Sequence, residues 1–206
     1  MAVKVLGIST SPRVEGNSDL LLKQALAGAE SQGGEVEYVH LRDFDIRPCV
    51  ECNFCFSSGK CRIEDDYQLL SAKMLEADRM IFATPVFFMT VCSQAKVLID
   101  RCQCLWARKY VLKEPIFEAG GLDRRAMVIA VGGTKGRKMF DCIRMTMKYY
   151  LDVLEMRYCM NLFVNKVDGR GEIQQRPDAL EEAYRLGGLL LSATELPEKS
   201  IDVELS

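Results

Sequence analysis

The sequence predicts a doubly wound α/β fold, in which one parallel sheet is covered by helices on both faces. Short β-branched or apolar segments alternate five times with longer segments of helical periodicity. The segment at 80–83 is continuously apolar, as expected of a central strand that is buried on both faces. The chain has 206 residues, 49% of them hydrophobic, which is enough to bury a full-sized core. Such alternation favours right-handed crossovers between parallel strands.

The first half of the chain begins with a strand at 3–8 and a turn-forming stretch rich in hydroxyl groups. A helix follows, for which Asn17 or Ser18 is a suitable N-cap, and two glycines end it. Alternating residues predict a second strand at 36–41. Two aspartates then favour the start of a helix at 65–76.

In the second half, we expect Thr84-Pro85 to end the third strand and a short polar tail to follow the last helix. No repeat, long linker or break in composition divides the chain, so we expect residues 1–206 to form one domain with a cysteine loop at about 47–63. The further strands are expected at 80–83, 126–131 and 158–164, and the further helices at 93–106, 138–154 and 177–192.

Charge and composition exclude several classes of function. Lys plus Arg is 27 and Asp plus Glu is 29, so the net charge of −2 argues against a nucleic-acid partner. No apolar run approaches the ~20 residues of a membrane helix, and no signal peptide is recognisable, so we expect a cytoplasmic protein. The single histidine, His40, lies in an alternating strand. We therefore expect no catalytic residue of the hydrolase kind.

The loop after the first strand, at 9–18, is a candidate phosphate site. It lacks the glycine patterns of dinucleotide and Walker loops, but it offers hydroxyls, an amide, a guanidinium and a helix N-terminus. Those groups suit one terminal phosphate, and the alternative is a well-capped turn without a ligand.

Two other loops end strands at the same edge of a sheet with the strand order 2-1-3-4-5. Residues 84–89 offer aromatic and apolar surface, and 131–134 offer bare backbone at two glycines. Together the loops suit a flat, partly apolar ring that is tethered to a phosphate. The alternative for Phe87, Phe88 and Met89 is a subunit interface or a core patch.

Nine cysteines are unusual in a cytoplasmic chain of this size. Four of them fall within thirteen residues as Cys49-x-x-Cys52-x-x-Cys55 followed by Cys61, and two of the gaps match bacterial ferredoxin runs. Structural zinc, a redox pair or free thiols are alternatives, although zinc sites usually separate two knuckles by a longer spacer. The scattered remainder is interpreted as core filler: Cys92, Cys102, Cys104, Cys142 and Cys159.

The pattern Ser9-Thr10-Ser11-Pro12-Arg13-x-x-Gly16-Asn17-Ser18 closely resembles the flavin phosphate loop of the NAD(P)H-dependent FMN reductase group of the flavodoxin-like superfamily. With the four-cysteine motif after the second strand, residues 3–167 resemble the iron-sulfur flavoproteins. The resemblance implies FMN and a 4Fe-4S cluster. The implied cluster ligands are Cys49, Cys52, Cys55 and Cys61. The implied FMN-binding residues are Ser9, Ser11, Pro12, Arg13, Asn17, Ser18, Pro85, Val86, Phe87, Phe88, Met89, Gly132 and Gly133.

These features predict a flavin-dependent oxidoreductase that passes electrons from a reduced donor, either ferredoxin or NAD(P)H, to a small oxidant. One alternative is a cluster-free NAD(P)H-dependent FMN or quinone reductase. Another, of a different class, is a non-catalytic electron-transfer or metal-binding module. Apolar surface near Met89 and Trp106, together with the assembly of the relatives as dimers or tetramers, leads us to expect a homodimer or homotetramer.

Overall fold

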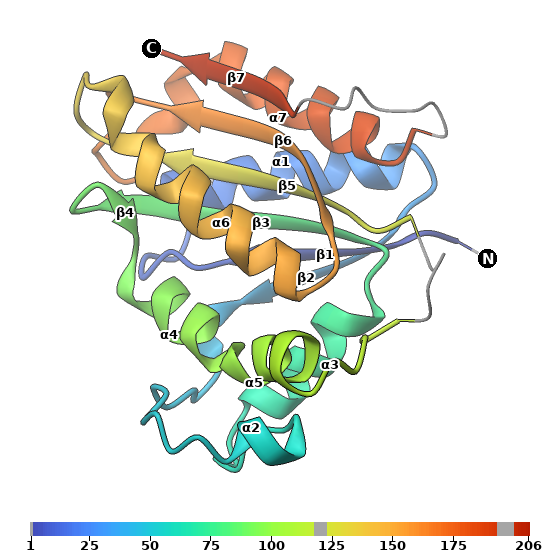
Figure 1. The fold of residues 1–206 in the computed structure, drawn as a ribbon. Helices are drawn as coiled ribbons and strands as arrows, with labels where there is room; N and C mark the ends of the chain where they lie inside the picture. Colours follow the sequence, from blue (N-terminus) through green and yellow to red (C-terminus); the bar gives the residue numbers. More distant parts are fainter. Residues whose placement is uncertain (1, 118–122, 193–199) are drawn as a thin grey trace.

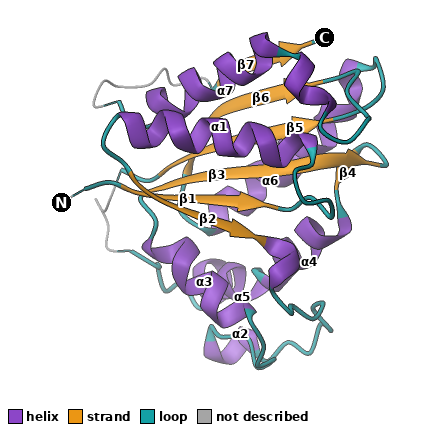
Figure 2. Ribbon diagram, turned by 180° about the vertical axis from the view of Figure 1, so that it is seen from behind, coloured by secondary structure: helices purple, strands orange, loops and turns teal. Residues whose placement is uncertain are grey.

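The computed structural model describes residues 2–117, 123–192 and 200–206, which form three layers (Figure 1). A largely parallel sheet lies in the middle, with α1 and α7 on one face and α3 to α6 on the other (Figure 2). The strands are β1 Lys4–Ser9, β2 Glu35–His40, β3 Arg79–Phe87, β4 Thr90–Val91, β5 Arg125–Val131, β6 Arg157–Val164 and β7 Ile201–Leu205. The α-helices are α1 Asn17–Ser31, α2 Cys55–Ser58, α3 Tyr67–Glu76, α4 Ser93–Arg101, α5 Gln103–Trp106, α6 Asp141–Val153 and α7 Pro177–Leu190. Within the described ranges, none of the helices has the length and apolar content that crossing a bilayer requires.

The sheet is larger than the sequence predicted. It has seven strands in the order β2-β1-β3-β5-β6-β7, and β4 pairs with β3 beside this path. The predicted segments are neighbours as β2, β1, β3, β5 and β6, but the five-stranded order 2-1-3-4-5 is wrong as a description of the whole sheet. β4 has only two residues, and β7 lies in the expected polar tail, where every second residue is apolar and the strand pairs in parallel with β6.

β3 does not end at Thr84-Pro85, as the sequence led us to expect. Pro85 pairs in register with Val131 of β5, and the strand continues to Phe87, which pairs with Thr90 of β4. A proline is tolerated where the ladder does not need its missing N–H. The extended strand therefore carries residues 86 and 87 beyond its pairing with β5.

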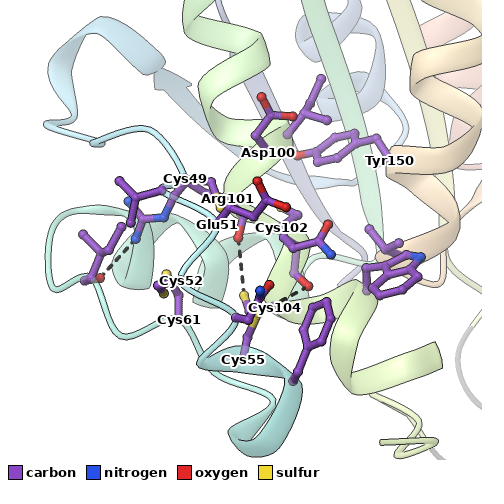
Figure 3. Close-up of a pocket in the computed structure, with 18 of the residues that line it drawn as sticks. Cys49, Glu51, Cys52, Cys55, Cys61, Asp100, Arg101, Cys102, Cys104 and Tyr150 are labelled. Atoms are coloured by element: carbon purple, nitrogen blue, oxygen red, sulfur yellow. Dashed lines mark hydrogen bonds between the residues drawn. The ribbon is translucent and has the colours of Figure 1, made fainter. Parts of the chain in front are cut away.

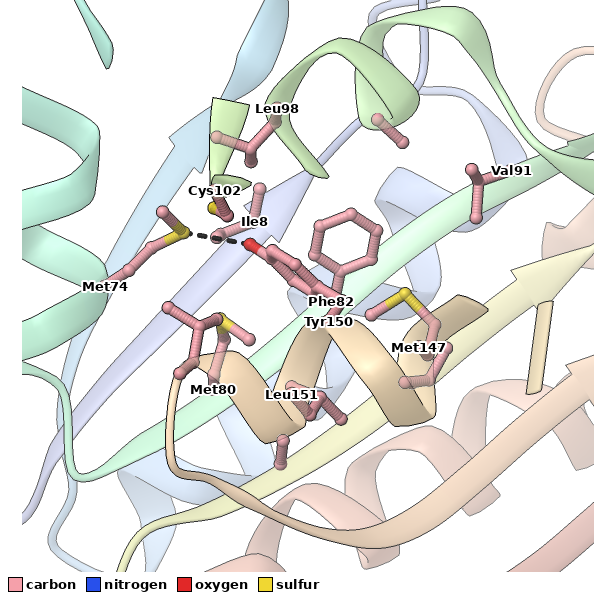
Figure 4. Packing of buried hydrophobic residues seen from close by; sticks show 14 of the residues in the cluster. Ile8, Met74, Met80, Phe82, Val91, Leu98, Cys102, Met147, Tyr150 and Leu151 are labelled. Atoms are coloured by element: carbon pink, nitrogen blue, oxygen red, sulfur yellow. Dashed lines mark hydrogen bonds between the residues drawn. The ribbon is translucent and has the colours of Figure 1, made fainter. Parts of the chain in front are cut away.

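Alternation along the central strands divides the core between the two faces. In β3, Met80 and Phe82 face α3 and α6, whereas Ile81 and Ala83 face α1 and α7. Phe82 meets Tyr150 edge to face at 5.5 Å between ring centroids, and both lie deep in the first of these clusters (Figure 4). Full burial of a side chain of this size contributes about 1.5–3 kcal/mol, so the strands form a firm base for the loops at their ends.

α1 and α7 touch through glycine on both sides of their contact. A Cβ atom on Gly28 would overlap the carbonyl oxygen of Tyr184, and one on Gly187 would overlap that of Ala25. Only residues without a side chain allow the two backbones to come this close. The contact fixes α1, and with it the loop that precedes α1, against the rest of the fold.

Candidate functional site

The predicted phosphate loop, residues 9–18, leaves the end of β1 and enters α1. The N-cap of α1 is Gly16, and no side chain caps the helix, so the prediction of Asn17 or Ser18 as the N-cap is wrong. The backbone N–H groups of the first helical turn therefore lack a side-chain acceptor. Helix N-termini of this kind bind anions through free N–H groups and the positive end of the helix dipole.

Asn17 and Arg13 instead bind the segment that follows β6. The amide Nδ2 of Asn17 donates to the carbonyl of Gly169 at 2.8 Å, and its Oδ1 accepts from the backbone N–H of Ile173 at 3.2 Å. Arg13 Nη1 donates to the carbonyl of Asp168 at 3.3 Å. The sequence analysis missed this segment, although its position after the fifth predicted strand places it at the same edge of the sheet.

Ser11 shapes the phosphate loop itself. Its hydroxyl accepts from the backbone N–H of Arg13 and donates to the Arg13 carbonyl, both at 3.1 Å, which forms a small hydroxyl-closed turn. A Cβ at Gly16 would stand 2.6 Å from the Ser11 oxygen, so glycine permits this turn to pack against the helix start.

The three predicted loops and the segment after β6 enclose one cavity of about 70 Å³. Of the predicted flavin residues, it brings together Ser11, Pro12, Arg13, Asn17, Ser18, Pro85, Val86, Phe87, Gly132 and Gly133. It adds Gly16, Val131, Val167 and Asp168, which the sequence analysis had not selected. Sites for complete drug-sized ligands occupy roughly 300–1,000 Å³. The cavity is smaller than such a site, and its volume suits one small group such as the phosphate expected from the sequence.

The remaining three predicted flavin residues do not line this cavity. Ser9 is fully buried, and its hydroxyl has no partner among the described residues. Phe88 and Met89 form the tip of the β3–β4 hairpin, where their side chains are 102% and 54% exposed. Both have positive φ, 47° and 64°, which is rare for bulky residues and costs about 1–3 kcal/mol each. The tip thus displays apolar side chains on a strained backbone.

A buried polar group lies where β1, β2 and the first turn of α1 meet. Tyr38 donates to Asp19 at 2.6 Å, and Lys23 forms an ion pair with the same carboxylate at 3.2 Å. Burial opposes the charge, but the hydrogen bond from Tyr38, the nearby Ser9 hydroxyl and the Lys23 ammonium outweigh it and lower the pKa of Asp19. His40 pairs with Ser9 in register, and neither of its ring nitrogens has a hydrogen-bond partner among the described residues. Burial lowers the pKa of His40 despite the nearby carboxylates.

The cysteine loop, residues 47–63, lies below the sheet against α4 and α5 and borders a second cavity (Figure 3). This cavity measures about 580 Å³. Its sulfur-bearing residues are Cys49, Cys52, Cys55, Cys61, Cys102 and Cys104. Positive φ values at Glu51 and Asn53, 52° and 56°, turn the backbone between the first cysteines.

The chemistry of these donors fits an iron-sulfur cluster, because the four thiols of the loop border one cavity and thiolate is the ligand such clusters use. In the part of the chain described, no three His, Cys, Asp or Glu side chains are grouped to hold a metal ion.

The other five cysteines divide into buried and exposed positions. Cys92, Cys102, Cys104 and Cys159 are buried, as predicted for core filler, but Cys142 is exposed on α6 and that prediction is wrong. Cys92 contacts the phosphate loop, since its sulfur lies 3.0 Å from the carbonyl oxygen of Thr10. Burial raises the pKa of the Cys104 thiol, whose sulfur contacts the Tyr67 hydroxyl at 3.2 Å.

Comparison with known families and curated proteins gives consistent matches. The model of the family described as NADPH-dependent FMN reductase matches residues 3–162. An iron-sulfur flavoprotein of Methanocaldococcus jannaschii is 46% identical over 103 residues, which are 50% of this chain and 53% of the relative. An iron-sulfur flavoprotein of Methanosarcina thermophila is 32% identical over 133 residues, or 65% of each chain. The aligned part thus spans about half the length of the first of these relatives.

Solved structures share the fold. An NAD(P)H:quinone oxidoreductase from Methanothermobacter marburgensis superimposes with a TM-score of 0.71 at 16% identity, covering 96% of this chain and 100% of the other. A flavone reductase gives a TM-score of 0.67 at 21% identity, covering 91% and 62%. At these identities the similarity establishes the flavodoxin-like architecture alone, which an archaeal flavodoxin also shares at a TM-score of 0.53.

Proposed function

This chain belongs to the NADPH-dependent FMN reductase family, and we propose that it is an FMN-dependent oxidoreductase that passes electrons between a reduced donor and a small oxidant. The observation that carries the proposal is the cavity at the carboxyl ends of β1, β3 and β5, where an uncapped helix N-terminus, a glycine turn and the extended end of β3 meet. Bound FMN would supply transfer of one or two electrons.

In this proposal, the protein binds and orients the cofactor rather than acting as an acid or nucleophile. The first-turn N–H groups of α1 and the guanidinium of Arg13 bind the phosphate. Asn17 holds the segment after β6 in place beside it. Pro85, Val86 and Phe87 would offer an apolar surface to the ring, and Gly132 and Gly133 would offer it backbone without side chains.

We further propose that Cys49, Cys52, Cys55 and Cys61 bind a 4Fe-4S cluster, which would supply one-electron transfer. The support is the shared cavity, the thiol donor set and the similarity to proteins named iron-sulfur flavoproteins. Ferredoxin or NAD(P)H is the proposed donor. A cluster-free NAD(P)H-dependent FMN or quinone reductase is the second candidate, favoured by the match to the NADPH-dependent FMN reductase family.

Anaerobic purification followed by iron, acid-labile sulfide and FMN analysis tests both candidates. The first predicts about four irons and one FMN per chain and a broad brown absorption beneath the flavin bands. Flavin alone, with rapid NADPH oxidation, supports the second candidate. Iron without flavin after reconstitution with excess FMN contradicts both and leaves a metal-binding module.

We also propose a homodimer or homotetramer, supported by the exposed apolar hairpin tip at Phe88 and Met89. Light scattering of the FMN-loaded protein tests this, and the paired variant Phe88→Ser/Met89→Ser should shift the protein towards the monomer. A monomeric wild-type protein at all concentrations would contradict it.

A further inference from the structure

Arg101 is the most completely buried charged side chain near the cysteine loop, and no step proposed above uses it. It is the last residue of α4, its side chain is 0% exposed, and it borders the cavity of the four cysteines (Figure 3). Burying a guanidinium is costly unless it is paired and hydrogen-bonded. Its contacts therefore indicate what the residue does.

The guanidinium binds both ends of the cysteine loop at once. Nη1 donates to the carbonyl of Arg47 at 2.8 Å and to Oδ2 of Asp65 at 2.6 Å, while Nη2 donates to the carbonyl of Ile63 at 3.1 Å. Asp65 strengthens the same junction by accepting from the backbone N–H of Arg47 at 3.0 Å. The segments before Cys49 and after Cys61 are thus tied to one side chain.

This arrangement lowers the entropy cost of bringing four cysteines together, because the loop is already closed at its base. The third nitrogen of the guanidinium, Nε, is buried and has no hydrogen-bond partner among the described residues. The plane of the guanidinium lies over Tyr67, with 4.6 Å between the guanidinium carbon and the ring centroid. The charge of Arg101 is paired with Asp65, and the Nε–H is a donor that remains for a group bound among the cysteines.

We propose that Arg101 is the positioning residue of the cysteine loop: it closes the loop at 47 and 63–65 and offers its Nε–H to the sulfur ligands that border the same cavity. The inference rests on the proposed cluster. Hydrogen bonds and charge near the sulfurs set the reduction potential of such clusters. A nearby cation favours the more negative, reduced form and raises the potential.

Helix α4 connects Arg101 to the central sheet. The helix starts directly after Cys92, whose backbone N–H donates to the Thr84 hydroxyl of β3 at 3.3 Å, and it ends at Arg101, about 13 Å away for nine residues at 1.5 Å each. The same helix thus connects β3, just before Pro85 of the proposed flavin cavity, to the base of the cysteine loop.

The test uses the full-length chain and four variants. Arg101→Gln alone leaves the Asp65 carboxylate, whose side chain is 4% exposed, without its partner and can unfold the protein. The double variant Arg101→Gln/Asp65→Asn removes both charges together. Arg101→Lys keeps the positive charge but lacks the planar guanidinium, which can donate to several acceptors at once. Arg42→Gln, which changes an exposed residue outside the cysteine loop, is the control for removing a positive charge.

We expect the double variant to bind FMN like the wild type but to lose iron to a chelator at least tenfold faster. Its cluster midpoint, followed by electron paramagnetic resonance, should fall by a tenfold change in the one-electron equilibrium, about 59 mV, because the Nε–H donor to the sulfurs is lost while the net charge is unchanged. Arg101→Lys should lose iron quickly with a smaller shift in potential, and Arg42→Gln should match the wild type. Unchanged potential and iron loss in the folded double variant would overturn the inference.

Failure of the cluster proposal gives a separate result. If the wild type takes up no iron, limited trypsin digestion of the iron-free proteins reads the loop closure directly at Lys60, which is exposed inside the loop. Cleavage there should be at least tenfold faster in the double variant than in the wild type. Equal rates would show that Arg101 does not close the loop.

Discussion

The side-chain amide of Asn17 joins α1 to Gly169, donating to that carbonyl at 2.8 Å while it accepts from Ile173 at 3.2 Å. Two segments about 150 residues apart in sequence are therefore held together at the edge of the cavity proposed for FMN phosphate. Both Nδ2 and Oδ1 of Asn17 are hydrogen-bonded to the segment after β6. We therefore expect Asn17 to affect FMN binding indirectly, through the position of that segment.

Replacing Ser11 and Asn17 together by Ala should weaken FMN binding by at least tenfold, or about 1.4 kcal/mol, because the loop loses the turn that Ser11 closes with Arg13 and the segment after β6 loses its hydrogen bonds to Asn17. Quenching of flavin fluorescence measures the affinity. Gln32→Ala, at the far end of α1, is the control. Iron content should stay at the wild-type level, and unchanged FMN affinity would refute the assignment of the loop.

Replacing Cys52 by Ala should abolish the iron-sulfur cluster and leave FMN binding intact, because Cys52 lies in the cysteine loop and not in the flavin cavity. Iron analysis and the visible spectrum of the anaerobic protein measure this. Cys142→Ala changes an exposed thiol outside the loop and should keep full iron. A Cys52→Ala protein with stoichiometric iron would show that the ligands are wrongly assigned.

Replacing Gly187 by Ala should destabilise the fold by about 1–3 kcal/mol, because the new methyl group overlaps the carbonyl of Ala25 and forces α1 and α7 apart. Thermal unfolding of the FMN-free protein measures the loss. Gly136→Ala is the matched control, since a Cβ there meets no atom within 4 Å. Equal melting temperatures for the two variants would contradict the close helix contact.

Stability should depend on pH through His40, the single histidine of the chain. Burial lowers its pKa below the ordinary 6.5, so in the folded state it stays neutral where the unfolded chain takes up a proton. The contribution of neutral His40 to the free energy of unfolding is complete above pH 6.5 and is lost as the pH falls through the pKa of His40 in the folded state. The pKa values of Asp19 and Asp65 are lowered from 3.8, so these carboxylates change the stability of the fold only below pH 3.8. They do not contribute in the pH range where His40 titrates.

Urea midpoints at pH 7.5 and 5.5 measure this dependence. The wild type should lose more stability between these pH values than His40→Gln, which cannot take up the proton. A slope that is identical in the two proteins would show that His40 has an ordinary pKa.

The sequence was most informative where local pattern and tertiary role agree. β5 is a run of buried apolar residues, and the residues of the phosphate loop carry their own turn chemistry, so both could be located. The N-cap of α1 could not, because the partner of Asn17 is Gly169, which no local rule identifies. Asp168 was missed for the same reason, since its main contact with Arg13 is made through a backbone carbonyl.

The limits of β3 and the presence of β7 also depend on distant partners. A proline normally ends a strand, but β5 supplies a neighbour for Pro85. The alternation at 201–205 is too short and too acidic to stand out, and it becomes a strand because β6 offers a free edge. Arg101 has no motif around it, and only the structure shows that it joins residues 47, 63 and 65.

The pairing of β7 with β6 has a practical consequence for handling the protein. Met160 to Val164 are matched in register by Ile201 to Leu205, so β7 shields the backbone of an apolar strand from solvent. Trimming the chain before Ile201 would leave β6 as an open edge able to recruit strands from other molecules and form aggregates. An affinity tag is therefore better placed at the amino end, with the carboxyl-terminal residues left intact.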